Sequence, residues 1–308
     1  MSDTAKLSGV LPVVQTPYFE DESIDFDTLH REIDWLLTAG ASGVVMAMVS
    51  ETLRLSTIER RQMAEHVCQA AAGRGAAVIS VGAESRHAAT ALARHAEQCG
   101  ATALMAIPPI ATAALTDELL EYYRALLRAV QIPVIVQDAS GYVGRPLPIV
   151  TQAQLFDEFG PERVMFKPEA APLGPNLTAL REATHGRARV FEGSGGVALV
   201  DSYHRGIVGT MPGAELIRAM VALWQALVRG KESNIYRLSL PIGALVQLQT
   251  GLDGFLAVEK YLLVKQGIFK NTVVRGPVAF RLDEETRREV DRLFELVCEA
   301  VSETATAS

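Results

Sequence analysis

The chain has 308 residues, of which 49% are hydrophobic and 21% charged, a balance typical of a folded globular protein and not of a disordered one. Its net charge of -7 excludes the basic footprint of a nucleic-acid-binding protein. No apolar run reaches the roughly 18 residues that a membrane-spanning helix needs, so we expect no membrane segment. The polar stretch 1–8 lacks the apolar core of a signal peptide, which predicts a cytoplasmic protein.

Short apolar runs alternate along the chain with longer amphipathic segments. Such uninterrupted runs are typical of parallel strands that are buried on both faces. The predicted strands are 10–15, 43–47, 76–81, 103–106, 133–137, 163–167, 188–192 and 206–210. Eight alternations of strand and helix without a large break predict an α/β protein with a closed (β/α)8 barrel, the TIM barrel.

Helix signals support the segments between the strands. The predicted helix 26–37 follows Asp25, a favourable N-cap residue. Four helices are predicted after the last strand, at 214–228, 233–250, 252–266 and 283–301. One of them completes the barrel and about three remain. We therefore expect a barrel over residues 1–229 and a C-terminal helical extension, 230–308, packed on it.

Cysteines and histidines give no sign of a metal site. Cys68, Cys99 and Cys298 share no CxxC or other ligand spacing, and we interpret them as thiols without a role. Their odd number fits a reducing compartment. His87 and His95 fall on one predicted helix but lie too far apart to act together. The sequence therefore predicts no metal and no cofactor.

A barrel places its active site at the carboxyl ends of its strands. Lys167 is the only one of the six lysines that ends a buried apolar strand. Burial disfavours the charged ammonium, and the neutral amine is the form that attacks a ketone. A structural ion pair with a nearby carboxylate is the alternative. Glu169 lies two residues further on, on the same face of an extended chain, where it could act as a base or form a loop salt bridge.

Other strand ends supply candidate substrate-binding groups. Amides of the loop Met48-Val49-Ser50, in particular those near Val49 and Ser50, could hold a carboxylate together with the Ser50 hydroxyl, although a plain turn is an alternative. Gln137, followed by Asp138, is a polar side chain at the end of an apolar strand; it could line the site or make only a loop contact.

The loop after the seventh strand is rich in glycine. Gly193, followed by Ser194, allows a ligand to approach the backbone closely. Loops at this place in a barrel often bind phosphate, so a phosphorylated substrate is left open. We assign Thr210, at the end of the eighth strand, to the same site.

Together these residues resemble the dihydrodipicolinate synthase / N-acetylneuraminate lyase superfamily of class I aldolases and dehydratases. The resemblance covers nearly the whole chain. It is carried by Gly9-Val10-Leu11-Pro12, Thr16-Pro17, the loop after the second strand, the strand at 132–136, the Lys167 strand and Val274-Arg275-Gly276-Pro277. It implies that Lys167 forms a Schiff base with a small 2-oxo acid.

The departures from the family pattern are informative. The loop that usually reads Gly-Thr-Thr-Gly-Glu is Ala47-Met48-Val49-Ser50-Glu51 here. Gln137 and Asp138 replace a catalytic tyrosine and the asparagine after it, and glutamine cannot serve as an acid or a base. Ile110 or Ala111 replaces the second tyrosine of the proton relay, and Tyr142 aligns with the arginine that binds aspartate semialdehyde.

One subgroup matches better. Ser50-Glu51, Val136-Gln137-Asp138-Ala139, Phe166-Lys167-x-Glu169 and Glu192-Gly193 look like the 2-keto-3-deoxy sugar acid dehydratases, notably the L-2-keto-3-deoxyarabonate type. The implied enamine on Lys167 expels the C4 hydroxyl, which is dehydration. Alternatively, a base removes the proton of the C4 hydroxyl and the C3–C4 bond breaks, which is aldol cleavage.

Aldol cleavage needs a base at the C4 hydroxyl, the role of the missing tyrosine, so its absence favours dehydration. A pyruvate-dependent aldolase or synthase and a non-catalytic 2-oxo-acid-binding homologue remain alternatives. The resemblance also implies a homo-oligomer, a tetramer or a dimer, with a small-molecule substrate as its only other partner.

Overall fold

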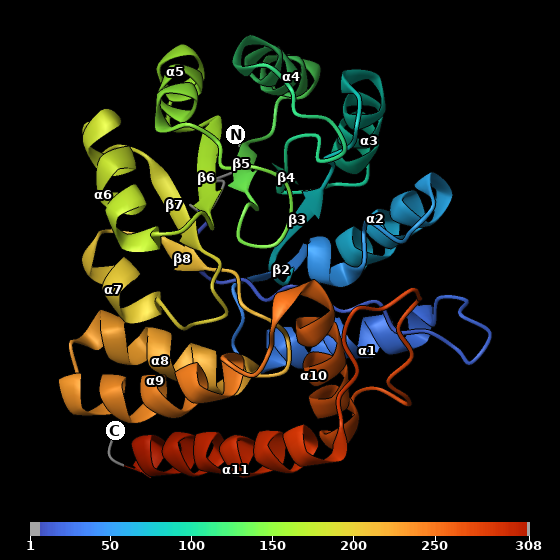
Figure 1. The fold of residues 1–308 in the computed structure, drawn as a ribbon, viewed down its shortest axis with the longest axis vertical. Helices are drawn as coiled ribbons and strands as arrows, with labels where there is room; N and C mark the ends of the chain where they lie inside the picture. Colours follow the sequence, from blue (N-terminus) through green and yellow to red (C-terminus); the bar gives the residue numbers. More distant parts are fainter. Residues whose placement is uncertain (1–6, 307–308) are drawn as a thin grey trace.

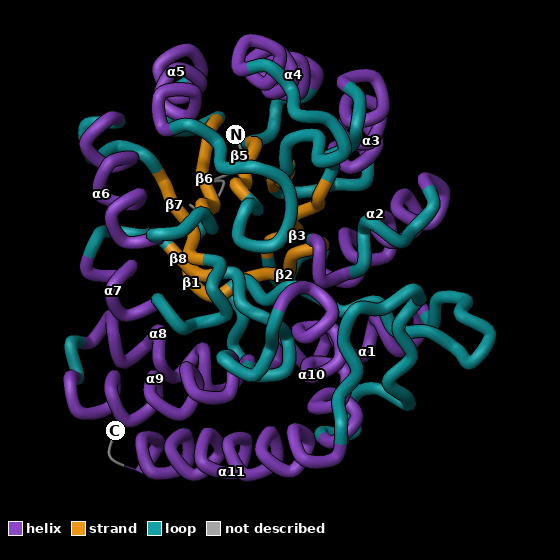
Figure 2. The backbone as a smooth tube through the Cα atoms, in the orientation of Figure 1, coloured by secondary structure: helices purple, strands orange, loops and turns teal. Residues whose placement is uncertain are grey.

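Eight strands form the centre of the computed structural model, which describes residues 7–306 (Figures 1 and 2). The strands are β1 Gly9–Val10, β2 Gly43–Met46, β3 Ala76–Ser80, β4 Ala103–Ala106, β5 Val134–Asp138, β6 Val164–Pro168, β7 Arg189–Glu192 and β8 Gly209–Thr210. All neighbouring pairs are parallel, in the order β1-β8-β7-β6-β5-β4-β3-β2. The (β/α)8 barrel predicted from the sequence is confirmed.

Helices surround the strands, one after each strand (Figure 2). They are α1 Phe26–Thr38, α2 Thr57–Ala71, α3 Arg86–Gln98, α4 Thr116–Ala129, α5 Ile149–Phe159, α6 Leu173–Ala183, α7 Leu199–His204 and α8 Ile217–Arg229. The predicted N-cap of the first helix is confirmed, because the Asp25 carboxylate accepts a hydrogen bond from the Thr28 amide at 3.1 Å.

Hydrogen bonds between the segment that follows β1 and strand β2 close the barrel. The Val45 amide donates to the Pro12 carbonyl, and the Val14 amide donates to the Val45 carbonyl, both at 2.9 Å. The first strand is shorter than the predicted 10–15, because Pro12 has no N–H to donate to a continuous ladder. The eighth strand starts three residues later than predicted, because Gly206 (φ 90°) still belongs to the turn after α7.

The barrel interior is filled with apolar side chains. The buried residues of this inner core are Leu7, Leu11, Val13, Val45, Ala47, Val78, Ala103, Met105, Ile135, Met165, Phe191 and Met211. Side chains two residues apart on a strand share a face. Gln137 and Lys167 follow Ile135 and Met165 by two residues, so they also point inward, at the carboxyl end of the barrel.

Three helices follow the barrel: α9 Glu232–Val246, α10 Gly251–Lys265 and α11 Glu284–Thr306. Helix α11 packs along α8 and α9, and α10 packs against a short 3-10 helix, η1 Met48–Ser50, after β2 (Figure 1). Helix α8 ends at Arg229, and the division of the chain at 229/230 remains a prediction. Among residues 7–306, no helix combines the length and the apolar character needed to cross a membrane.

A buried ion pair attaches α10 to the barrel. The Lys260 ammonium, which is fully buried, lies 2.6 Å from Glu51 Oε1 and 2.7 Å from the Val273 carbonyl oxygen. Its Nζ also lies 4.5 Å from the centre of the Tyr18 ring. Burial lowers the pKa of Lys260, and the charge of Glu51 opposes that shift.

We expect the substitution Lys260→Ala to lower the free energy of unfolding by about 3–5 kcal/mol, because buried Glu51 would lose its close partner and keep only Arg54, at 3.8 Å. Urea unfolding followed by circular dichroism measures this loss. The control is Lys265→Ala, which removes a partly exposed pair with Asp291 and should cost no more than about 1 kcal/mol. Equal small effects of both substitutions would contradict the assigned role of Lys260.

Candidate active site

A lysine, a glutamate and a glutamine lie in contact in a pocket at the carboxyl ends of the strands. Lys167 on β6 is paired in register with Gln137 on β5. The Lys167 ammonium lies 2.5 Å from Glu169 Oε1, and Gln137 Nε2 donates to Glu169 Oε2 at 2.7 Å. All three side chains line the same pocket. Lys167 therefore has the carboxylate partner of a structural ion pair and also lines a pocket at the carboxyl ends of the strands.

Burial sets the electrostatics of this cluster. The side chains of Lys167 and Glu169 are only 4% and 6% exposed. Burial raises the pKa of Glu169, while the charge of Lys167 and the hydrogen bonds from Lys167 and Gln137 oppose that rise. Gln137 Oε1 is buried and accepts no hydrogen bond from the rest of residues 7–306. The cluster thus combines an amine, a carboxyl group that can exchange a proton, and a free acceptor.

Gly193, at the end of β7, leaves the space that this cluster occupies. A Cβ at this position would lie 2.6 Å from Lys167 Nζ and 2.7 Å from Glu169 Oε1. We expect Gly193→Ala to lower kcat/KM by about 10²-fold through displacement of these groups, with little change in the far-ultraviolet spectrum. The matched control is Gly243→Ala on α9, where a Cβ meets open space and activity should not change. Full activity of the Gly193 variant would disprove the close packing.

The loop after β2 forms the opposite wall of the pocket. Met48 and Val49 line it, and their amides form no hydrogen bond within residues 7–306. The predicted role of the Ser50 hydroxyl is not supported by its position. This hydroxyl accepts from the Ala47 amide at 3.0 Å and donates to the Val14 carbonyl at 2.5 Å, so it stabilises the loop and does not face the pocket.

The position of Asp138 does not match its predicted role as a substrate-binding group. Its carboxylate is buried and accepts hydrogen bonds from two amides of the following loop, Ser140 at 3.0 Å and Leu147 at 2.8 Å. It does not line the pocket. Asp138 fixes the loop that carries Tyr142, because a short acidic side chain at a strand end readily caps nearby amides.

Ser194 and Thr210 also lie outside the pocket lining, and both bind Glu192. The Ser194 amide donates to Glu192 Oε1 at 2.5 Å, and the Thr210 hydroxyl donates to Glu192 Oε2 at 2.7 Å. The buried Glu192 carboxylate therefore joins the ends of β7 and β8. The Ser194 hydroxyl accepts from the Ala198 amide at 2.8 Å, so Ser194 and Thr210 hold the glycine loop in place and neither lines the pocket.

Sequence reasoning missed several residues of the pocket wall. Tyr142, Leu252, Phe255 and Glu259 all line it, and the last three come from α10. The Tyr142 ring meets the Phe255 ring edge-on at 5.6 Å between centroids. The available signal was the charged pair Glu259-Lys260 inside the otherwise apolar stretch 255–264 of α10, but only the fold shows that this helix reaches the barrel opening.

Glu259 lies beside a second buried glutamate, Glu215. A Cβ on Gly213 would lie 2.6 Å from Glu259 Oε1 and 2.3 Å from Glu215 Oε2, so the two carboxyl groups meet at this glycine. Gln15 donates to Glu259 Oε2, and Gln249 donates to Glu215 Oε1 at 3.2 Å. Burial raises the pKa of Glu215 to about 7, and burial together with the charge of Glu215 raises the pKa of Glu259.

The raised pKa of Glu215 predicts that the free energy of unfolding falls as the pH rises. Unfolded glutamate titrates near pH 4.3, so between about 4.3 and 7 the folded state keeps a proton that the unfolded state releases. The free energy of unfolding should decrease across this window and level off above it. In Glu215→Gln the decrease should be smaller by roughly 3 kcal/mol, measured by urea unfolding over a pH series. Glu299→Gln, an exposed control, should keep the wild-type slope; identical slopes in all three proteins would contradict the prediction.

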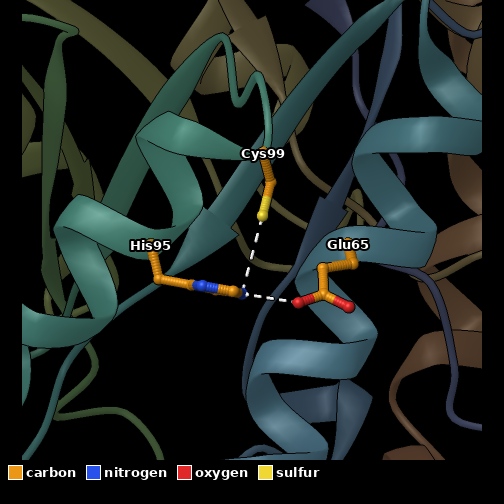
Figure 3. Close-up of side chains that lie close together, drawn as sticks. All are labelled: Glu65, His95 and Cys99. Carbon is orange, nitrogen blue, oxygen red and sulfur yellow. Dashed lines mark hydrogen bonds and ion pairs between the residues drawn. The ribbon is translucent and has the colours of Figure 1, made fainter.

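A further group of potential ligands lies outside the barrel, where α2 and α3 meet (Figure 3). His95 Nε2 lies 3.1 Å from Glu65 Oε1 and 3.5 Å from Cys99 Sγ. This group cannot be seen in the sequence, because Glu65 comes from α2 and His95 from α3. None of the three residues lines the pocket, and the expectation that the protein uses no metal remains a prediction.

A (β/α)8 barrel with one buried lysine at the end of β6, in contact with a carboxylate, has the architecture of the class I barrel lyases. The sequence model described as the dihydrodipicolinate synthetase family matches residues 6–296 of this chain. The chain belongs to that family, whose members are class I lyases, and the resemblance stated from the sequence is confirmed.

Individual relatives have different activities. The chain is 26% identical over 295 residues to L-2-keto-3-deoxyarabonate dehydratase from Azospirillum brasilense, and the aligned region covers 94% of each chain. It is 32% identical over 136 residues to 4-hydroxy-tetrahydrodipicolinate synthase from Laribacter hongkongensis (strain HLHK9), or 44% of this chain and 47% of that one. The structure of 4-hydroxy-tetrahydrodipicolinate synthase from Methylacidiphilum fumariolicum SolV has the same fold, with a TM-score of 0.87 at 19% identity over 98% of this chain and 99% of that one.

Proposed function

We propose that the protein is a Schiff-base lyase that removes water from a 2-keto-3-deoxy sugar acid. The observation that carries this proposal is the contact of Lys167, Glu169 and Gln137 in one buried pocket, with glutamine where the family usually has its catalytic tyrosine. The similarity to an L-2-keto-3-deoxyarabonate dehydratase over 94% of both chains supports the same reaction type.

The first step would be attack of the Lys167 amine on the C2 carbonyl. Transfer of the ammonium proton to Glu169, only 2.5 Å away, would supply the neutral amine. Glu169 would return this proton to the departing hydroxyl as the adduct loses water, which gives an iminium and restores the Glu169 carboxylate. The iminium acidifies the C3–H bond. C3 is two bonds from Nζ, so a carboxylate that contacts Nζ is also within reach of the C3 proton. Glu169 is therefore proposed as the base that forms the enamine.

The enamine would then expel the C4 hydroxyl as water. Glu169, protonated in the previous step, can return a proton to this leaving group, and its raised pKa favours that protonated state. The free Gln137 Oε1 can accept a hydrogen bond from a substrate hydroxyl or a water molecule, and it cannot take the proton. Aldol cleavage needs a base at the C4 hydroxyl, which Gln137 does not provide.

The C1 carboxylate would bind to the free amides of Met48 and Val49. Backbone N–H groups at the start of a helical turn suit a negatively charged group, even where the usual threonine hydroxyls are absent. Holding the carboxylate there while C2 is bonded to Lys167 fixes the orientation of C3 and C4. We further propose that the protein works as a homo-oligomer, a tetramer or a dimer.

Product analysis with 2-keto-3-deoxy-L-arabonate tests the reaction type. Dehydration keeps all carbon atoms in one product, whereas aldol cleavage releases pyruvate, which a lactate dehydrogenase assay detects. We expect loss of one water by mass spectrometry and no pyruvate. Release of pyruvate would replace the proposal by an aldolase, the second candidate. Binding of 2-oxo acids without any turnover would favour the non-catalytic homologue.

A further inference from the structure

Glu259 is a charged residue of the pocket wall to which the proposed reaction assigns no role. Its side chain is 1% exposed, comes from α10 and lines the pocket next to Gly213. Gln15 occupies one carboxyl oxygen, Oε2. The other oxygen, Oε1, has no partner within residues 7–306 and lies at Gly213, which also lines the pocket. A ligand in the pocket can therefore reach Oε1.

The surroundings of Glu259 are acidic. Glu215 Oε2 lies beside Gly213, as Glu259 Oε1 does, and has no donor within residues 7–306. A third buried carboxylate, Glu32, accepts from the Gln15 amide at 2.9 Å. Lys260, whose positive charge acts on Glu259, is occupied by Glu51 and the Val273 carbonyl. Burial and the mutual proximity of Glu215 and Glu259 raise the pKa of both, so the pair shares a proton and carries less than two charges.

The pocket has no cation to spare for a second anionic group. Among its described lining residues, Lys167 is the only lysine or arginine, and it already contacts Glu169. The C1 carboxylate is proposed to use the amides of Met48 and Val49. A second carboxylate on the substrate would meet Glu259 and Glu215 with no positive partner, whereas a hydroxyl group could both donate to and accept from this proton-sharing pair.

We infer that Glu259, supported by Glu215, is the specificity-determining residue that selects 2-oxo acids with an uncharged far end and rejects dicarboxylic ones. The inference rests on the proposed function, because it assumes that C2 of the substrate is bonded to Lys167. It restricts the substrate class to monocarboxylic sugar acids. The geometry that carries it is the carboxyl pair at Gly213, on the wall of the pocket that holds Lys167.

Borohydride trapping with two probes of equal length tests this inference. 2-Oxopentanoate and 2-oxoglutarate are both five-carbon 2-oxo acids and differ only at C5, a methyl group or a carboxylate. At pH 7 the wild-type protein should trap 2-oxopentanoate on Lys167 at least about 10-fold faster, a ratio that corresponds to a modest electrostatic penalty. In Glu259→Gln, which keeps the shape and the contact with Gln15, the ratio should fall at least about fivefold. The exposed control Glu299→Gln should keep the wild-type ratio.

The outcomes separate the two proposals. Trapping of both probes at equal rates in the wild type, or an unchanged ratio in Glu259→Gln, would overturn the role of Glu259 and leave the Schiff-base chemistry intact. Failure of both probes to label Lys167 would overturn the proposed function and this inference with it. Circular dichroism and urea unfolding of each variant confirm that the compared proteins are folded.

Discussion

Replacing Lys167 by alanine is expected to lower turnover of a 2-keto-3-deoxy sugar acid by on the order of 10⁴–10⁶-fold, the range seen when a covalent nucleophile is removed. The residual pocket keeps the loop amides and Glu169 but has no amine to bond C2. The fold should persist, because burial already raises the pKa of Glu169, which can take up a proton when its partner is gone. Steady-state kinetics and urea unfolding of the same preparations measure both properties.

Lys167→Arg is the matched variant that separates charge from nucleophilicity. The guanidinium can keep an ion pair with Glu169, but it stays protonated and cannot attack a carbonyl group. Turnover should fall as far as in the alanine variant, with less effect on stability. Retention of substantial activity in either variant would rule out covalent catalysis by Lys167 and reduce the lysine–glutamate contact to a structural ion pair.

Glu169→Gln is expected to lower kcat by about 10²–10⁴-fold while borohydride trapping on Lys167 persists. The amide keeps the size of the side chain and can still contact Lys167 and Gln137, but it cannot take the C3 proton or return it to the leaving hydroxyl. Nuclear magnetic resonance can follow the exchange of the C3 protons with deuterated water. This exchange should be slow in the variant, which reports the missing proton transfer directly.

Asp291→Asn provides the control for this variant, because Asp291 also contacts a lysine, Lys265, but lies far along the chain in α11. Its kinetics should match the wild type. Normal C3 proton exchange in Glu169→Gln would assign the base to another group. Loss of trapping together with turnover would instead place Glu169 in the formation of the Schiff base.

The barrel could be predicted from the sequence because its strands are buried on both faces and therefore appear as uninterrupted apolar runs. The exact ends of the strands could not be predicted from the sequence. Pro12 cannot donate to the ladder, and Gly206 belongs to a turn, so the first and last strands are much shorter than their apolar runs. Periodicity reports burial, whereas strand length depends on backbone hydrogen bonds.

The site was predictable where it depends on local spacing. Lys167 and Glu169 share one face because they are two residues apart, and the structure places them in contact. Side chains at strand ends are harder to assign, since Ser50 and Asp138 bind loop backbone groups and do not face the pocket. Glu259 could not be found, because it reaches the pocket only through the packing of α10 against the barrel.

Borohydride reduction in the presence of pyruvate, followed by peptide mass spectrometry, tests the central claim most directly. A Schiff base between pyruvate and an amine becomes a stable secondary amine on reduction, and its mass marks the modified residue. The account predicts a single major adduct on the peptide that contains Lys167. A folded protein that gives no adduct, or an adduct on another lysine, would contradict it.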